Sequence, residues 1–190
     1  LREISLQLLK SGESRLLTIG QYEYFLRPFT RPWRLVVVGA AHIAQPLATM
    51  ANDAGFDVTI IDPRRGYATE TRFPAVTLVH EWPDTALPDL SLDARSAVIA
   101  LSHDPKIDDP ALTAALDSPA FYIGALGSQR NHKKRLERLV GGGYGAAELA
   151  RIRGPVGLNI GGNHPSEIAV SILAEIIAVK NGKPLGDSSN

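Results

Sequence analysis

The sequence contains no cysteine, carries no net charge and has no long apolar run. The absence of cysteine excludes disulfide bonds, thiolate metal ligands and a cysteine nucleophile. Lysine and arginine together number 20, as do aspartate and glutamate, so the overall charge favours neither nucleic acid nor an anionic membrane as a partner. No apolar stretch approaches the roughly 20 residues of a membrane-spanning helix, and no signal peptide is visible, so we expect a cytoplasmic protein.

Three segments of different character divide the 190 residues. Segment 1–30 combines one amphipathic stretch with two short strand-like stretches, which predicts an N-terminal extension: an edge hairpin or the remnant of another domain. Exposed strands of this kind invite pairing with a second copy, which makes a homodimer one candidate assembly. Residues 31–182 are expected to form the main domain, and 183–190 are expected to form a flexible tail.

The main domain alternates short apolar runs with segments of helical periodicity. Its strand-like runs are 35–38, 58–61, 76–79, 97–101, 121–123 and 157–160, and its helix-like runs are 43–54, 110–116, 128–140 and 165–180. In segment 1–30 the helix-like run is 1–10 and the strand-like runs are 15–19 and 23–27. Alternation of this kind requires right-handed crossovers. It predicts an α/β fold with a doubly wound, mostly parallel sheet and helices on both faces.

The first strand of the main domain ends in a glycine turn that opens a helix. Gly39, Ala40, Ala41 and His42 form this turn, and Asp62 follows about twenty residues later at the end of the next strand, as in dinucleotide-binding motifs. Such a helix N-terminus favours phosphate, and the acid would accept a hydrogen bond from a ribose hydroxyl.

Two interpretations of this turn stay open. Ala41 stands where a second glycine lets the backbone approach a pyrophosphate, so Gly39 serves either a dinucleotide site or only a tight turn. Likewise, Arg64 either contacts a 2′-phosphate or is a solvated loop residue.

In a doubly wound sheet of the common order, the fourth strand lies beside the first. Ser102, His103 and Asp104 should therefore lie next to the Gly39 turn. His103 and Asp104 are candidate catalytic residues for proton transfer, or with His42 for a divalent metal. Alternatively they form a loop network, and Asp108 or Asp109 caps a helix that begins at Pro110.

Two further glycine-containing turns open helices. The first contains Gly124, Gly127 and Ser128 and runs into a helix whose first turns hold Arg130 and three more cations, Lys133, Lys134 and Arg135. Cations there oppose the helix dipole, so either an anionic ligand or plain solvation is expected. The second turn, 157–165, leads into the last helix.

The combined motifs resemble one protein family. They are segment 34–39 with His42, segments 62–64 and 72–74, segment 102–104 with Asp108, segment 122–128, and the run from 155–158 through 165–172. In this order they resemble the C-terminal Rossmann domain of the xanthine dehydrogenase accessory (XdhC/CoxI) family, over about residues 30–182.

The resemblance implies a binding and delivery protein rather than an enzyme with its own turnover. Family members bind molybdenum cofactor, as molybdopterin or its cytosine dinucleotide, help install its terminal sulfur, and pass it to an apo molybdenum hydroxylase. A cysteine-desulfurase-type sulfur donor would be a second partner. The cofactor would sit among the turns at 39–42, 102–104 and 124–130, with no resident metal.

The sequence departs from the family pattern in several places. Members commonly carry a preceding domain with a glycine-rich segment and often cysteine, whereas 1–30 is short and lacks both features. Ala41 replaces the usual glycine, Gln129 a common basic residue and Asn159 a common aspartate. The alternative function is a Rossmann-type NAD(P)-dependent oxidoreductase with His103 as its acid–base group.

Overall fold

The computed structural model describes residues 2–183, and the chain divides into two compact units, Leu1–Pro32 and Trp33–Asn190. The first unit consists of helix α1 (Arg2–Ser11) and a hairpin of β1 (Arg15–Ile19) and β2 (Tyr22–Leu26). The strands pair antiparallel and form a two-stranded sheet of their own, not an edge of the larger sheet. The expected tail at 183–190 lies, apart from its first residue, outside the described residues.

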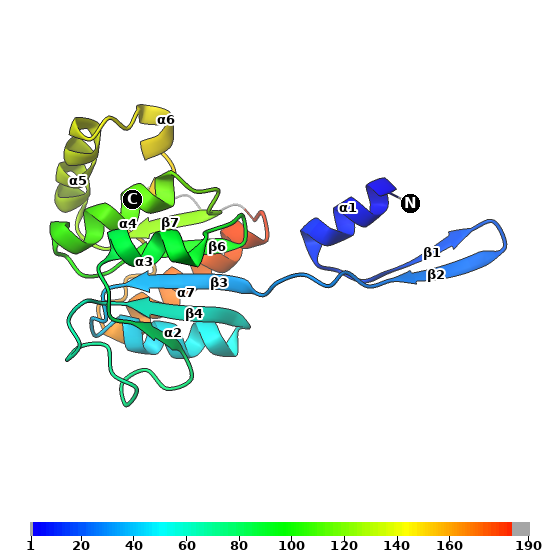
Figure 1. Ribbon diagram of the computed structural model, residues 1–190, viewed down its shortest axis with the longest axis horizontal. Helices are drawn as coiled ribbons and strands as arrows, with labels where there is room; N and C mark the ends of the chain where they lie inside the picture. Colours follow the sequence, from blue (N-terminus) through cyan, green and yellow to red (C-terminus); the bar gives the residue numbers. More distant parts are fainter. Residues whose placement is uncertain (1, 184–190) are drawn as a thin grey trace. The chain divides into compact units, whose positions relative to one another are not determined.

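The second unit is built on a six-stranded parallel sheet with the strand order β5-β4-β3-β6-β7-β8 (Figure 1). The strands are β3 (Trp33–Val38), β4 (Phe56–Ile61), β5 (Thr77–Val79), β6 (Ser96–Ala100), β7 (Tyr122–Ala125) and β8 (Ile152–Arg153). The central strands are buried on both faces because helices cover both sides. The predicted doubly wound fold is confirmed, and β3 and β6 are neighbours at the point where the strand order reverses.

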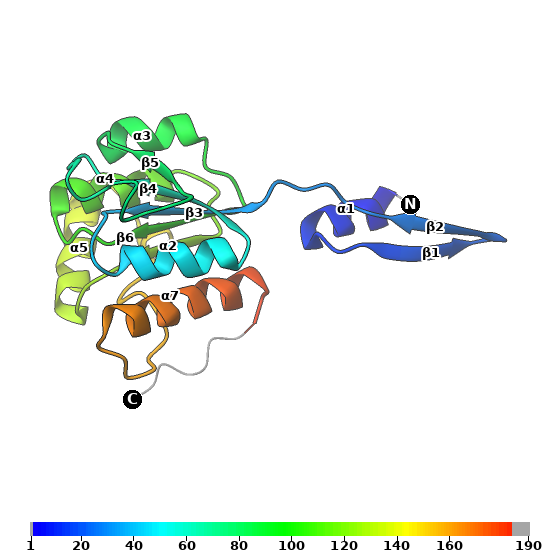
Figure 2. The same cartoon turned by 90° about the horizontal axis from the view of Figure 1, so that it is seen from below.

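Helices form a layer on each side of the sheet. Helices α2 (Ala44–Asp53) and α7 (Pro165–Lys180) lie side by side on one face (Figure 2), where their apolar residues share a core with alternate residues of β3 and β6. The other face carries α3 (Pro83–Leu90), α4 (Pro105–Leu116) and α5 (Gln129–Gly141), followed by the short α6 (Ala146–Leu149). None of the helices in the described part of the chain has the length and apolar content needed to span a bilayer.

The predicted sixth strand at 157–160 is wrong. The edge strand β8 is Ile152–Arg153, and the Val156 N–H still donates to Ala125 O of β7 at 3.2 Å before the chain leaves the sheet. The backbone N–H of Gly157 donates to the Glu175 carboxylate at 2.8 Å, and the N–H of Leu158 donates to the Ser171 carbonyl at 3.2 Å. These bonds tie the segment to α7, so it cannot continue the ladder along β7.

The predicted start of the helix-like run 110–116 is also wrong. Helix α4 begins at Pro105 rather than Pro110, because the Asp104 side chain accepts the Lys106 N–H at 3.0 Å and caps it. Asp109 is therefore not a cap and instead forms an ion pair with Arg138 at 2.6 Å. Helices α3 and α6 were not anticipated, since α3 contains two prolines and α6 has only four residues.

Candidate functional site

Three turns follow the carboxyl ends of β3, β6 and β7 and lie at one edge of the sheet. Backbone hydrogen bonds continue the register past the strands: Leu101 N–H donates to Val38 O at 2.8 Å, and Leu126 N–H to Ala100 O at 2.9 Å. The turns at 39–42, 102–104 and 126–130 are consequently neighbours, as their place in the strand order predicts.

The first two turns touch directly. Gly39 is buried with φ +101°, and a Cβ at this position would lie 2.6 Å from the Ser102 backbone nitrogen. Glycine is thus required both by the backbone conformation and by the approach of the neighbouring turn. Ala40, the next residue, is fully buried, whereas Ala41 is half-buried and His42 is exposed.

Asp62 and Arg64 form a closed ion pair beside the Gly39 turn. Arg64 donates from Nε to Asp62 Oδ1 at 2.9 Å and from Nη2 to Oδ2 at 2.8 Å, while the Ala40 N–H donates to Oδ2 at 2.8 Å. Burial alone would raise the pKa of Asp62, but these hydrogen bonds outweigh burial and hold it below the ordinary value of 3.8. In this conformation the Asp62 carboxylate faces protein donors on both oxygens, and Arg64 also lies 4.4 Å from the Tyr67 ring centroid.

The turn after β6 is held by a buried carboxylate. The Ser102 hydroxyl donates to Asp108 Oδ1 at 2.6 Å, and the Ser102 N–H donates to the same oxygen at 3.1 Å. Burial raises the pKa of Asp108 above its ordinary value in spite of these bonds and of Arg135, whose Nη2 lies 3.7 Å from Oδ2. These bonds connect Ser102 with Asp108, and Asp104 caps helix α4.

His103 is the strained residue of this turn. It is exposed and has φ +63°, a left-handed conformation that is uncommon for residues other than glycine. It lines a small cavity of about 230 Å³ together with Asp108, Asn131, Lys134, Arg135 and Arg138. Among residues 2–183 no group of three or more histidine, aspartate or glutamate side chains is arranged as a metal site.

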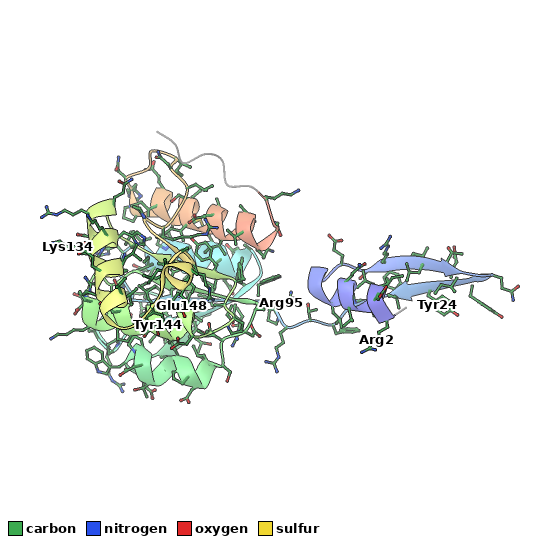
Figure 3. The ribbon with its side chains drawn as sticks, turned by 90° about the horizontal axis from the view of Figure 1, so that it is seen from above. Arg2, Tyr24, Arg95, Lys134, Tyr144 and Glu148 are labelled. Carbon is green, nitrogen blue, oxygen red and sulfur yellow. The ribbon has the colours of Figure 1, made fainter. Side chains whose placement is uncertain are left out.

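The turn after β7 places a cationic helix beside the other two. Ser128 caps α5 by accepting the Asn131 N–H at 3.3 Å, and Gly127 has φ +138°. Arg130, Lys133 and Lys134 are exposed, and Lys134 extends outward from the domain (Figure 3). None of these three cations has an ion-pair partner within the described ranges.

Gly124 lies inside β7 rather than in the turn. A Cβ there would lie 2.6 Å from a Val156 methyl carbon and 2.9 Å from the Tyr122 ring. This glycine is required for packing of the segment after β8 against the sheet.

A larger cavity, which was not predicted from the sequence, lies next to the turn that follows β7. It encloses about 900 Å³ where β8, loop 154–163 and α7 meet, and its wall includes Gln129, Arg153 and Glu175. Glu175 is buried, and it sits among the apolar residues that α7 packs against the sheet. A single acid within an apolar helix stripe was the signal in the sequence.

Comparison with known proteins gives three curated relatives. The chain is 36% identical over 154 residues to "Uncharacterized protein YqeB" of Escherichia coli K12, covering 80% of this chain and 28% of that protein. It is 34% identical over 148 residues to a protein of Bacillus subtilis 168 named as a probable xanthine dehydrogenase subunit, covering 77% of this chain and 43% of that protein. It is 33% identical over 162 residues to "Molybdenum cofactor insertion chaperone PaoD" of Escherichia coli K12, covering 85% of this chain and 44% of that protein.

A solved structure has the same fold. A crystal structure described as a xanthine dehydrogenase from Bacillus halodurans superposes with a TM-score of 0.71 at 26% identity, over 89% of this chain and 47% of that one. This chain spans less than half the length of each of these four proteins. The family model described as the XdhC Rossmann domain matches residues 35–176, and the chain therefore belongs to the XdhC Rossmann domain family.

Proposed function

We propose that this domain binds molybdenum cofactor as cargo and helps deliver it to a xanthine dehydrogenase-type molybdenum hydroxylase. The observation that carries the proposal is the convergence of three turns, each of which opens a helix, beside the exposed cations Arg130, Lys133 and Lys134 of α5. Helix N-termini and cations together stabilise an anionic, phosphate-bearing guest. Molybdopterin and its cytosine dinucleotide are guests of that kind.

The names of two relatives support the same role. One is called a molybdenum cofactor insertion chaperone, and the other is named as part of a probable xanthine dehydrogenase. We infer that the partners are an apo molybdenum hydroxylase, which receives the cargo, and a cysteine-desulfurase-type protein, which supplies its terminal sulfur. The chain itself contains no cysteine to carry that sulfur.

The geometry disfavours a standard nicotinamide dinucleotide at the same turn. Asp62 would have to release Arg64 or the Ala40 amide before it could accept a hydrogen bond from a ribose hydroxyl. Ala41 also adds a methyl group where a pyrophosphate would approach the backbone. We therefore propose that Asp62 fixes the turn at 39–42 and that the exposed cations of α5 attract the anionic cofactor.

Equilibrium titration of the purified chain tests the proposal. Molybdopterin and its cytosine dinucleotide should bind, whereas NADH and NADPH should bind weakly. The double variant Arg130→Gln/Lys133→Gln should lose affinity, because it removes two of the three exposed cations in the first turns of α5. Lys183→Gln removes one exposed charge beyond the far end of α7 and should bind like the wild type.

A second assay tests delivery. Cofactor-loaded protein should raise the activity of an apo-hydroxylase faster than free cofactor does. Tight binding of a nicotinamide cofactor alone, together with its turnover on a carbonyl substrate, would overturn the proposal in favour of an oxidoreductase.

A further inference from the structure

The cavity of about 900 Å³ is formed by parts of the chain that the glycine turn at 39–42 does not reach. Its wall comes from β8, from loop 154–163, from the start of α5 and from the inner side of α7. The sheet ends at β8, so this cavity lies beyond the last strand of the described sheet, next to the turn that follows β7. A guest held by that turn can extend into it.

A buried carboxylate forms the floor of the cavity. Glu175 is only 6% exposed, and its Oε2 accepts the Tyr122 hydroxyl at 2.5 Å and the Gly157 N–H at 2.8 Å. Its other oxygen faces Arg153 Nη1 at 3.5 Å. Burial, followed by the charge of Glu175, raises the pKa of Tyr122, so the phenol stays protonated and remains a donor. The carboxylate thus holds the wall through one oxygen and contacts Arg153 through the other.

Arg153 is the group of this wall that can meet a ligand. Its side chain is 39% exposed, and Glu175 and the Tyr122 ring, 5.9 Å away, hold it from one side. Beyond the contact with Glu175, its guanidinium makes no hydrogen bond to the part of the protein that the structure describes. A guanidinium fixed by a carboxylate behind it presents its remaining N–H groups in a fork that suits phosphate oxygens.

The rest of the wall suits a flat heterocycle. Gln129 and Asn159 contribute side-chain amides, each able to donate and accept hydrogen bonds, as the edge of a nitrogen heterocycle requires. Ile160 is 53% exposed and Ile168 is half-buried, so the same wall offers apolar surface to a ring face. Close packing fixes the loop backbone just before Asn159, since a Cβ on Gly157 would lie 2.4 Å from the Ser171 hydroxyl.

We infer that this cavity is a second ligand subsite, which binds a phosphate ester of a nitrogen heterocycle and in which Arg153 contacts the phosphate. A pterin phosphate and a nucleotide share this chemistry. The inference rests on the proposed function and extends it. In this extension, residues beyond β8 bind the part of the cargo that the three turns do not hold. Glu175 and Tyr122 act as positioning residues for Arg153.

The test measures binding of two probes, molybdopterin and cytidine 5′-monophosphate, to the full chain and to variants. Arg153→Gln removes the cation and should raise the Kd of the probe that occupies the cavity by about 10- to 100-fold. Ile160→Asp places a negative charge on the exposed rim and should raise the Kd by about two- to fivefold at low salt. Ile160→Asn is the matched control, since it has the same shape without the charge and should lack this salt-dependent loss.

The outcomes separate the two proposals. If the variants bind molybdopterin more weakly, the pterin phosphate is the occupant of the cavity. If they bind cytidine monophosphate more weakly, the nucleotide is the occupant. Either result supports the subsite. The subsite is overturned if the wild type binds molybdopterin, Arg153→Gln and Ile160→Asp bind it equally well, and cytidine monophosphate does not bind. That result leaves the proposed function standing. If the wild type binds neither probe, both proposals fail. Equal competition by inorganic phosphate alone would contradict the requirement for a heterocycle.

Discussion

Gly39 and Ser102 come so close that a Cβ on Gly39 would lie 2.6 Å from the Ser102 backbone nitrogen. Because backbone cannot move aside as a flexible side chain can, Gly39→Ala should separate the turns after β3 and β6. The left-handed φ of +101° adds strain of its own. We expect the free energy of unfolding to fall by about 2–4 kcal/mol, measured by urea denaturation.

Gly55→Ala is the control for this substitution. Gly55 also has a positive φ, +83°, but no atom lies within 4 Å of its added Cβ. Gly55→Ala should therefore lower the free energy of unfolding only through backbone strain, by about 1 kcal/mol. Equal losses for the two variants would show that the contact between the turns contributes nothing.

Asp62 stabilises the fold through Arg64 and the Ala40 amide. Asp62→Asn keeps the shape but weakens the charge-assisted hydrogen bonds, and should lower the free energy of unfolding at neutral pH by about 1.5–3 kcal/mol. The control Asp57→Asn removes an exposed carboxylate from β4 and should change the free energy of unfolding by less than about 0.5 kcal/mol.

The pH dependence of this difference follows from the lowered pKa of Asp62. The folded state holds the deprotonated carboxylate more strongly than the unfolded chain does, whose pKa is near 3.8. The stabilisation is therefore complete above pH 3.8 and is lost as the pH falls from there through the folded-state pKa. Denaturation curves of wild type and Asp62→Asn should converge in acid, and a constant difference across this range would contradict the assignment.

Much of the architecture could be predicted because it depends on local patterns. The apolar runs that end at Val38 and Ile61 are buried on both faces, so their composition alone marks parallel strands. The adjacency of the turns at Gly39 and Ser102 followed from the strand order of doubly wound sheets. The helix-like run predicted at 128–140 corresponds to α5, which Ser128 caps.

The parts that could not be predicted depend on contacts distant in sequence. Segment 157–160 has a strand-like composition, but the Glu175 carboxylate, 18 residues away from Gly157, draws its backbone to α7. Two prolines compete for the start of α4, and only the Asp104 side-chain hydrogen bond selects Pro105. The pairing of Asp62 with Arg64 was missed because the motif suggests an external partner for each.

His132 should make the stability depend on pH near neutrality. Burial lowers its pKa below the ordinary 6.5, and the charge of Arg135 lowers it further. Below pH 6.5 the unfolded chain takes up a proton that the folded protein does not, so the free energy of unfolding should fall until the folded-state pKa is reached. His132→Gln should remove this part of the pH dependence in urea denaturation, whereas exposed His42→Gln should retain it. Identical pH profiles for wild type and His132→Gln would contradict the effect.

The hairpin of β1 and β2 predicts self-association. Leu16 and Phe25 face each other across it and are 58% and 66% exposed, and an isolated two-stranded hairpin is marginal in water. Pairing with a second copy would cover these side chains and the free strand edges, so we expect a homodimer in sedimentation velocity experiments. Leu16→Thr/Phe25→Thr keeps β propensity but removes apolar area and should shift the protein toward monomer. Val140→Thr, at an equally exposed apolar position on α5, should leave the dimer intact, and a wild type that is monomeric at every concentration would refute the model.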